Sequence, residues 1–283
     1  QGGAGNLVLD NNARKGVATL SNDSYIFNDV AINGGTNFYL PDQLSCTNLN
    51  VQNNAILTAL DNNILNINNV FDLNQSQIKG QNQKVLNIVG NNIVLTNSEI
   101  NANVFIQGNS LVLDSGSKIL STGLGYLAEQ GPGAGIIGYG GSYGGLGGGN
   151  YESSGFGQPY GNEQTPDDFG SGGGNPIATR KGGNGGGKIE IIISGQLNLN
   201  GQIISDGDSG MPMGCWGCGY PATGAGSGGT VYISASSING AGIVSSNGGL
   251  ASMDGAGGGG GGRIAVYGNI DNFTGIFEAL GGI

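Results

Sequence analysis

Short apolar runs alternate with polar turns along the whole chain. The clearest runs are residues 6–10, 110–114, 188–193, 230–233 and 263–267. They are rich in β-branched or aromatic residues and are bounded by Gly, Asn, Asp or Ser, which is typical of strands. No segment of ten or more residues carries apolar side chains at the i, i+3, i+4, i+7 spacing of a surface helix. The pattern predicts an all-β chain.

Internal repeats indicate how the strands are arranged. Three units begin at Lys188, Thr230 and Arg263, and each has a strand, a polar turn, a short strand and a glycine 12 or 13 residues from its start. Each continues into another apolar pair, and residues 110–123 form a related unit. Further upstream, Leu-Asn-aliphatic triplets begin at Leu49, Leu65 and Leu86, with gaps of 16 and 21 residues. These spacings suit the coils of a β-solenoid with variable turns.

A parallel β-helix accounts physically for the residue types. Inward positions of successive coils form aliphatic ladders, and the corners take Asn, Asp and Gly because these tolerate left-handed φ. Asn side chains can also stack along a corner as a ladder of amides. The rival architecture is a hairpin-based sandwich, for which Asn33-Gly34 and Asn239-Gly240 are candidate two-residue turns. The long, variable insertions favour the β-helix.

The composition divides the chain. Of 61 glycines, 10 lie in residues 1–120 and 51 in residues 121–283, whereas 25 asparagines precede Gly131 and 10 follow it. We therefore expect an Asn-rich solenoid part in residues 1–124. A Gly/Tyr-rich insertion packed on the solenoid should span 125–187, and Gly-rich solenoid repeats 188–283, all within one continuous domain. Collagen is excluded because Pro is scarce and glycine lacks a strict period of three.

Charge and missing residue types exclude several function classes. The chain has 9 basic and 19 acidic residues, a formal net charge of −10, and no histidine. An acidic chain without a basic tract is a poor partner for nucleic acid. The lack of histidine excludes Ser-His-Asp and Cys-His catalysis and zinc held on imidazole. No apolar run reaches the length of a membrane span.

Blocks of glycine punctuate the second half of the chain. They are residues 131–135, 141–145, 169–174, 226–229 before a strand, and 257–262 before Arg263. In this order they resemble the glycine-rich repeat regions of very large secreted or surface proteins of bacteria and protists. The resemblance implies an extracellular, β-helical, structural or adhesive role and brings no catalytic residues. The chain begins at Gln1 with no charged or apolar leader, so we expect a mature secreted form or a unit of a longer protein.

The three cysteines suggest one disulfide. Cys215 and Cys218 form a C-x-x-C in a glycine-rich loop, and no helix follows as a redox motif would require. Zinc would need further ligands. We predict a local disulfide formed in an oxidising compartment, with Cys46 buried and inert.

Acidic groups in loops raise two further hypotheses. Asp167-Asp168, Asp206-Gly207-Asp208 and Asp254 could bind calcium, although solvated turn aspartates are the favoured interpretation. Parallel β-helices also host polysaccharide-degrading enzymes, which use clustered carboxylates. The acidic residues of the insertion give no pair at a defensible separation, so we predict no enzyme activity and no cofactor. These residues are Glu152, Glu163, Asp167 and Asp168.

Five tyrosines lie close together in glycine-rich sequence. Tyr126, Tyr139, Tyr143, Tyr151 and Tyr160 could stack on sugars, or could anchor the insertion on the solenoid, which we favour because glycine offers no buried area. The sequons Asn22, Asn74 and Asn272 are glycosylation acceptors if the host glycosylates.

The leading functional hypothesis is a non-enzymatic extracellular or cell-surface structural protein that forms a homo-oligomeric, head-to-tail filament. A β-helix has two open ends, and this sequence offers neither a capping helix nor a polar terminal coil. The predicted joint contains Leu7, Val8, Leu9, Ile276, Phe277 and Leu280. The alternatives are a monomer whose termini cap its ends, a carbohydrate-binding adhesin, and a polysaccharide-degrading β-helix enzyme.

Overall fold

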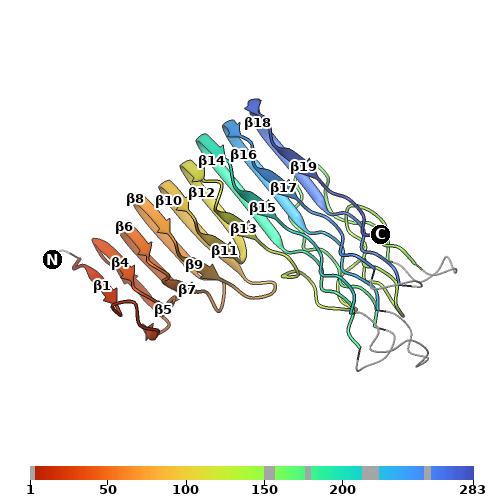
Figure 1. Ribbon diagram of the computed structural model, residues 1–283, viewed down its shortest axis with the longest axis horizontal. Coiled ribbons are helices and arrows are strands. Elements are labelled where there is room, and N and C mark those ends of the chain that lie inside the picture. Colours follow the sequence, from red (N-terminus) through yellow and green to blue (C-terminus); the bar gives the residue numbers. More distant parts are fainter. Residues whose placement is uncertain (1–3, 150–156, 176–179, 212–222, 252–255) are drawn as a thin grey trace.

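The computed structural model describes residues 4–149, 157–175, 180–211, 223–251 and 256–283. Within these ranges every regular element is a strand (Figure 1). The described residues contain no helix that could cross a membrane. The all-β prediction is therefore confirmed.

The strands form two sheets whose members alternate along the chain. The long sheet consists of β1 (Leu7–Asp10), β3 (Ser24–Ile26), β4 (Asp29–Asn33), β6 (Gln43–Gln52), β8 (Ile64–Asn74), β10 (Val85–Thr96), β12 (Asn103–Leu113), β14 (Lys188–Leu199), β16 (Thr230–Gly240) and β18 (Arg263–Phe273). The short sheet consists of β2 (Gly16–Thr19), β5 (Thr36–Tyr39), β7 (Ile56–Thr58), β9 (Gln77–Lys79), β11 (Glu99–Asn101), β13 (Lys118–Leu120), β15 (Gln202–Ile204), β17 (Ile243–Ser245) and β19 (Ile276–Glu278).

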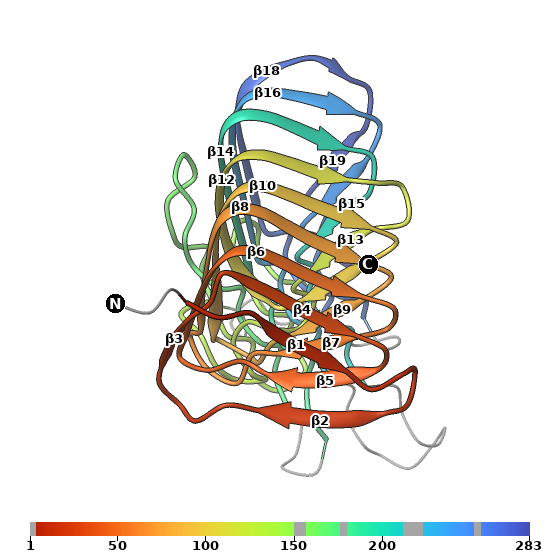
Figure 2. The same ribbon diagram turned by 90° about the vertical axis from the view of Figure 1, so that its left-hand side faces the viewer.

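Each coil joins a strand of the long sheet to one of the short sheet, and the coils stack along one axis (Figure 2). Every pairing between neighbouring coils is parallel, for example β6 with β8 and β5 with β7. A hairpin-based sandwich would pair its strands antiparallel. The fold is thus the parallel β-helix that the repeats predict.

The core consists of aliphatic and aromatic ladders between the two sheets. In the long sheet, one ladder runs through Val30, Leu49, Phe71, Ile93, Leu111 and Leu197, all fully buried. In the short sheet, the matching ladder includes Phe38, Leu57, Ile78, Ile100, Ile119, Ile203 and Val244. Because side chains alternate between the two faces of a strand, each strand supplies every second residue to this core.

Asparagine at the corners behaves as expected. Asn12, Asn53, Asn54 and Asn97 all have positive φ. Asn also forms a short ladder between coils: Asn69 Nδ2 donates to Asn48 Oδ1 at 3.0 Å, and Asn48 Nδ2 donates to Asp29 Oδ1 at 2.7 Å. The Asn-rich composition of the first half therefore supplies both left-handed corners and hydrogen bonds between coils.

The strands of the long sheet are longer than the sequence suggests. The expected strand, turn and strand beginning at Lys188 is one continuous strand, β14. The predicted polar turn is instead an irregularity in the pairing with β16, where the register shifts between Ile193 and Gln196. A bulge of this kind bends a strand without ending it.

Long glycine-rich segments extend from the coils of the C-terminal half, where Figure 1 shows extended chains that run away from the sheets. Backbone hydrogen bonds join these segments to one another, for example from Gly186 to Ser227 at 2.8 Å and from Gly228 to Gly260 at 2.9 Å. We call them together the glycine bundle; it comprises residues 121–126, 138–148, 168–174, 182–187, 205–210, 223–229, 246–251, 256–262 and 279–283.

The bundle has a repeat of three residues. Along residues 256–262, bonds to any one neighbouring segment recur at every third position: Gly257 donates to Gly138 and Gly260 to Gly141, Gly259 to Gly249 and Gly262 to Ser246, while Gly258 accepts from Gly148 and Gly261 from Gly145. A polyproline II helix has three residues per turn and makes no internal hydrogen bonds. The same three-residue spacing in residues 256–262 lets their backbone groups bond to several neighbouring segments at once.

Only glycine allows the segments to approach so closely. A Cβ atom on Gly185 would overlap the carbonyl of Gly170, and one on Gly259 would overlap the carbonyl of Gly226. In both cases the obstacle is backbone, which cannot rotate away as a side chain can. The glycine runs, which offer no apolar surface, thus form an ordered layer through backbone contacts.

Candidate functional site

The C-terminal end of the solenoid is open. Within the described residues, β18 pairs only with β16 and β19 only with β17, so each has one edge without a strand partner. We call this end, with the inward side chains Ile264, Val266, Phe273 and Phe277, the C-terminal end face. Phe277 continues the ladder of Ile203 and Val244 but is 38% exposed, whereas those two residues are fully buried.

A hollow of about 450 Å³ opens on this end face. It is lined by Gly144, Glu163, Gly262, Arg263, Ile264, Val266, Phe277, Glu278 and Ala279. Three of its apolar residues, Ile264, Val266 and Phe277, belong to the core ladders, and its charged residues have both signs. Phe273 and Phe277 pack together with their ring centroids 4.9 Å apart. The end face is therefore an apolar cross-section with a charged rim.

The N-terminal end is open as well (Figure 2). In the described residues β1 pairs only with β4, β2 only with β5, and β3 only with β6. Its inward side chains, which we call the N-terminal end face, are half-buried against the core: Leu7, Leu9, Ala18, Leu20, Tyr25 and Phe27. No described strand lies over β3, so its edge is recessed by one coil relative to β1.

The structure divides the six residues of the predicted joint. Leu7, Leu9 and Phe277 point inward, whereas Val8 is 65% exposed and points outward, as does Ile276. Leu280 lies in the glycine bundle, where its carbonyl accepts a bond from Gly248 at 2.8 Å and its side chain is exposed. All six residues lie at the two ends, and their role in assembly stays a prediction.

Sequence reasoning missed several residues of the end faces. They are Ala18, Leu20, Tyr25 and Phe27 at one end and Ile264, Val266 and Phe273 at the other. The repeat alignment contained the signal for two of them. It places Ile264 and Val266 opposite Ile189 and Ile191, which alternate with polar residues and are fully buried.

A buried cluster fixes the insertion to the solenoid. The Tyr143 hydroxyl is 2.7 Å from Thr230 Oγ1, which donates to the carbonyl of Asp168 at 2.7 Å. The Arg263 guanidinium lies 5.4 Å from the centre of the Tyr143 ring and donates to the carbonyl of Tyr160 at 2.8 Å. Burial raises the pKa of Tyr143 to about 12, so the phenol is neutral at physiological pH.

The other tyrosines of this region are also packed. Tyr126 contacts Phe169 edge to face, with the ring centroids 6.0 Å apart, and Tyr160 contacts Tyr143 at 4.9 Å. Tyr139 is half-buried, and Tyr151 lies outside the described residues. The rings of Tyr126, Tyr143 and Tyr160 thus pack against other aromatic rings, which supports the interpretation that they anchor the insertion.

The loop carboxylates are used within the bundle. Asp206 Oδ1 accepts bonds from Ser245 Oγ at 2.8 Å and from the Asn247 amide at 2.7 Å. Burial raises the pKa of Asp206 and of Asp208 above the ordinary range for aspartate. In the described part of the chain, no three Asp, Glu or Cys side chains gather as a metal site would require. Glu152 and Asp254 lie outside it.

Cys46 is buried and forms no disulfide within the part of the chain that the structure describes. Burial, with a smaller contribution from the charge of Asp29, raises its pKa to about 12, so it is a protonated, unreactive thiol. The predicted disulfide between Cys215 and Cys218 falls outside the described residues. Of the three sequons, Asn22 and Asn272 are exposed and Asn74 is half-buried at the end of β8.

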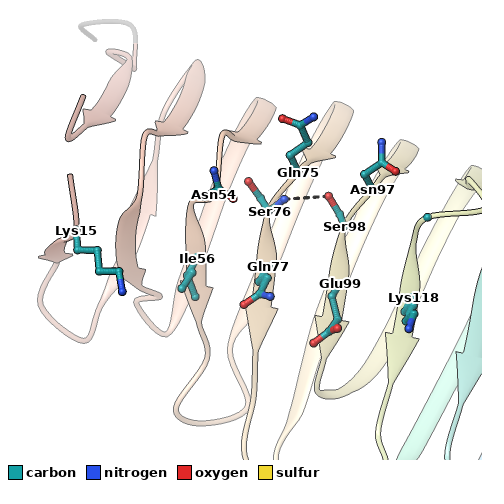
Figure 3. A pocket seen from close by; sticks show the side chains of 11 residues that line it. Lys15, Asn54, Ile56, Gln75, Ser76, Gln77, Asn97, Ser98, Glu99 and Lys118 are labelled. Carbon is teal, nitrogen blue, oxygen red and sulfur yellow. Dashed lines mark hydrogen bonds between the residues drawn. The ribbon is translucent and has the colours of Figure 1, made fainter. Parts of the chain in front are cut away.

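A polar groove crosses the outer side of the short sheet (Figure 3). It has a volume of about 570 Å³ and is lined by Lys15, Asn54, Ile56, Gln75, Ser76, Gln77, Asn97, Ser98, Glu99, Gly116 and Lys118. Its serines link neighbouring coils, since the amide of Ser76 donates to Ser98 Oγ at 3.1 Å. The groove presents side-chain amides and charges of both signs over several coils, whereas the hydroxyls of Ser76 and Ser98 are buried and donate to backbone carbonyls.

Comparison of the chain with protein-family models, with curated proteins and with solved structures found no match. The resemblance to glycine-rich repeat regions therefore rests on the sequence motifs alone. The β-solenoid that it implies is observed, with two parallel sheets of stacked strands.

Proposed function

We propose that this chain is a structural subunit without enzymatic activity that stacks end to end into an extracellular fibre. One observation carries the proposal: ladder positions that are fully buried in the inner coils are open to solvent in the first and last coils. Phe277 and Val244 occupy the same ladder and differ in this way. The two ends thus resemble a core that has been cut across.

Two physical effects favour stacking at such ends. Unpaired strand edges are templates for further strands, and buried apolar area contributes roughly 25 cal/mol per Å². Because the two ends differ, contact between copies is head to tail, and a contact of this kind that does not close into a ring extends into a filament.

Negative-stain microscopy together with analytical ultracentrifugation tests the proposal. Wild-type protein should form fibres whose axis follows the solenoid. Phe277→Asp places a charge at the joint and should give a folded, β-rich monomer by circular dichroism. Val89→Asp is the matched control, because Val89 is exposed on an inner coil, and it should still form fibres. A wild-type monomer at high concentration, with both terminal strands protected from hydrogen exchange, would contradict the proposal.

The extracellular location is supported by the resemblance to secreted and surface proteins. Antibody labelling of intact, unpermeabilised cells of the source organism tests it, and we expect surface signal. Labelling that requires permeabilisation would contradict this part of the proposal.

A second candidate function is glycan binding at the polar groove, whose side-chain amides and charged groups suit the hydroxyl groups of a saccharide. A glycan array tests it with Gln77→Ala, because Gln77 lies in the groove. Binding that this substitution abolishes would favour an adhesin over a purely structural role. Turnover of acidic polysaccharides would instead favour the less supported third candidate, a degrading enzyme.

A further inference from the structure

One of the two outward ladders of the short sheet has exposed apolar residues at both of its ends. It runs through Val17, Asn37, Ile56, Gln77, Glu99, Lys118, Gln202, Ile243 and Ile276. Five members between its ends are polar or charged, whereas the terminal two are apolar and exposed, at 71% for Val17 and 54% for Ile276. Both are β-branched residues that pack well beside each other in a sheet.

In the adjacent inward ladder, the side chains at the two ends are complementary in size. It begins at Ala18, passes through Phe38, Leu57 and the other buried residues, and ends at Phe277. Ala18 is its smallest side chain, and Phe277, together with Phe38, is its largest. A small side chain at one end and a large one at the other can pack against each other when two copies meet.

We infer that copies join in a single register, in which β2 of one copy continues the short sheet beyond β19 of the next. Val17 then lies beside Ile276, Ala18 against Phe277, and Thr19 beside Glu278. The inference rests on the proposed end-to-end function and adds its register. When the two copies stack in this register, β1 of one copy continues the long sheet beyond the second half of β18 of the other. Leu9 then follows Phe273 in the inward ladder of the long sheet.

Other registers fit less well. Side chains alternate between the two faces of a strand, so a shift by one residue would pair an inward side chain of one copy with an outward side chain of the other. Ala18 and Phe277 would then no longer lie in one ladder. A shift by two residues keeps the sides but places Ile276 beside Thr19 or Lys15. Only the unshifted register pairs the two exposed apolar residues, and it brings no two like charges together.

Cysteine cross-linking tests the register. Neighbouring strands lie about 4.8 Å apart, within the Cα separation of roughly 4.4–6.8 Å that a disulfide needs. A variant with Val17→Cys and Ile276→Cys should therefore give a ladder of covalent oligomers on non-reducing gels. The matched control, Thr19→Cys with Ile276→Cys, uses another exposed residue of β2 whose Cα would lie about 8 Å away, and we expect at least about tenfold less product. The single variants measure any cross-linking through the native cysteines.

The outcomes separate the register from the function. Fibres without selective cross-linking of the first pair would overturn the register and leave the proposed function standing. Absence of fibres in wild-type protein would overturn both.

A size exchange gives a second, independent readout. Ala18→Phe should block fibres because two large rings then meet, and Phe277→Ala should weaken them. The double variant with Ala18→Phe and Phe277→Ala should restore fibre formation to within about threefold of wild type. If the double variant is no better than Ala18→Phe alone, while wild-type protein forms fibres, Ala18 and Phe277 do not meet at the joint.

Discussion

The solenoid coils and the glycine bundle lie in one chain but are held together in opposite ways. In the coils, ladders such as Leu49, Phe71 and Ile93 fill the space between two sheets with side chains. In the bundle, segments such as residues 256–262 contact their neighbours mainly through backbone atoms. The coils depend on apolar volume, and the bundle depends on its absence.

Because of this difference, substitution by alanine has opposite steric effects in the two regions. In a coil, substitution by alanine removes volume and leaves a cavity. In the bundle, it adds a methyl group where a neighbouring carbonyl already lies. A series of alanine variants across both regions therefore tests whether the coils and the bundle are stabilised in these two different ways.

The largest effect is expected in the coils. Phe71→Ala removes a fully buried ring from the middle of a ladder, and we expect a loss of about 4 kcal/mol in the free energy of unfolding. Urea denaturation measures it. Val94→Ala is the control, since Val94 lies on the outward side of β10, and it should cost about 1 kcal/mol or less. Equal losses for both variants would mean that the ladders are not the source of stability.

The next effect is expected in the bundle. Gly185→Ala places a methyl group on the Gly170 carbonyl, and we expect a loss of roughly 1–3 kcal/mol together with faster proteolysis of the bundle segments. At Gly5 an added Cβ has no neighbour within 4 Å, so Gly5→Ala should be neutral. A neutral Gly185→Ala would show that the segments are not in close backbone contact.

A smaller effect is expected where the two regions meet. Tyr143→Phe removes the hydroxyl that bonds to Thr230 at 2.7 Å inside the protein, and should cost about 1 kcal/mol. Tyr232→Phe is a suitable control, because Tyr232 is half-buried beside Tyr267. If calorimetry finds the two variants equally stable, the hydroxyl does not help to hold the insertion.

The smallest effect concerns pH and should appear only in the bundle. The pKa values of Asp206, Asp208 and Asp168 are raised by burial. A folded-state pKa above the unfolded value means that stability falls as pH rises past the unfolded pKa and recovers on acidification. The bundle should therefore gain stability as the pH falls from neutrality towards about 4.

The variant Asp206→Asn tests whether titration of Asp206 causes this pH dependence of stability. The amide oxygen can still accept the bonds from Ser245 and Asn247, but the residue no longer titrates. Thermal unfolding between neutral and acidic pH should then depend less on pH than in wild-type protein. The Lys84 ion pair lowers the pKa of the exposed Asp61 and acts in the opposite direction, but solvent screens it. A pH profile of thermal stability in Asp206→Asn that equals that of wild-type protein would contradict a contribution of Asp206 to the pH dependence.

The coils could be predicted from the sequence because side chains carry their pattern. Ile191 and Ile233 occupy the same place in two repeats, are fully buried, and pair in register in the structure. The left-handed corners at Asn53 and Asn97 also follow from residue type. Which way Val8 points could not be predicted, because a three-residue apolar run does not specify which of its sides is buried.

The bundle could not be predicted for a physical reason. Gly260 bonds to Gly141 and Gly228, yet nothing distinguishes any of these from the other glycines of their runs. Backbone groups are the same at every residue, so the sequence permits the close approach but does not specify the partner. The end faces lie between these cases, since the sequence predicts two uncapped ends, while most of their inward side chains, such as Tyr25 and Phe273, are identified only in the stacked structure.

Hydrogen exchange measured by mass spectrometry tests the account most directly, because it reads the backbone bonds on which the bundle depends. Peptides from residues 223–229 and 256–262 should exchange slowly, at rates close to those of β8 and β10. Exchange of these glycine segments at the rate of an unfolded chain, with β8 and β10 still protected, would contradict the view that backbone hydrogen bonds hold the bundle together.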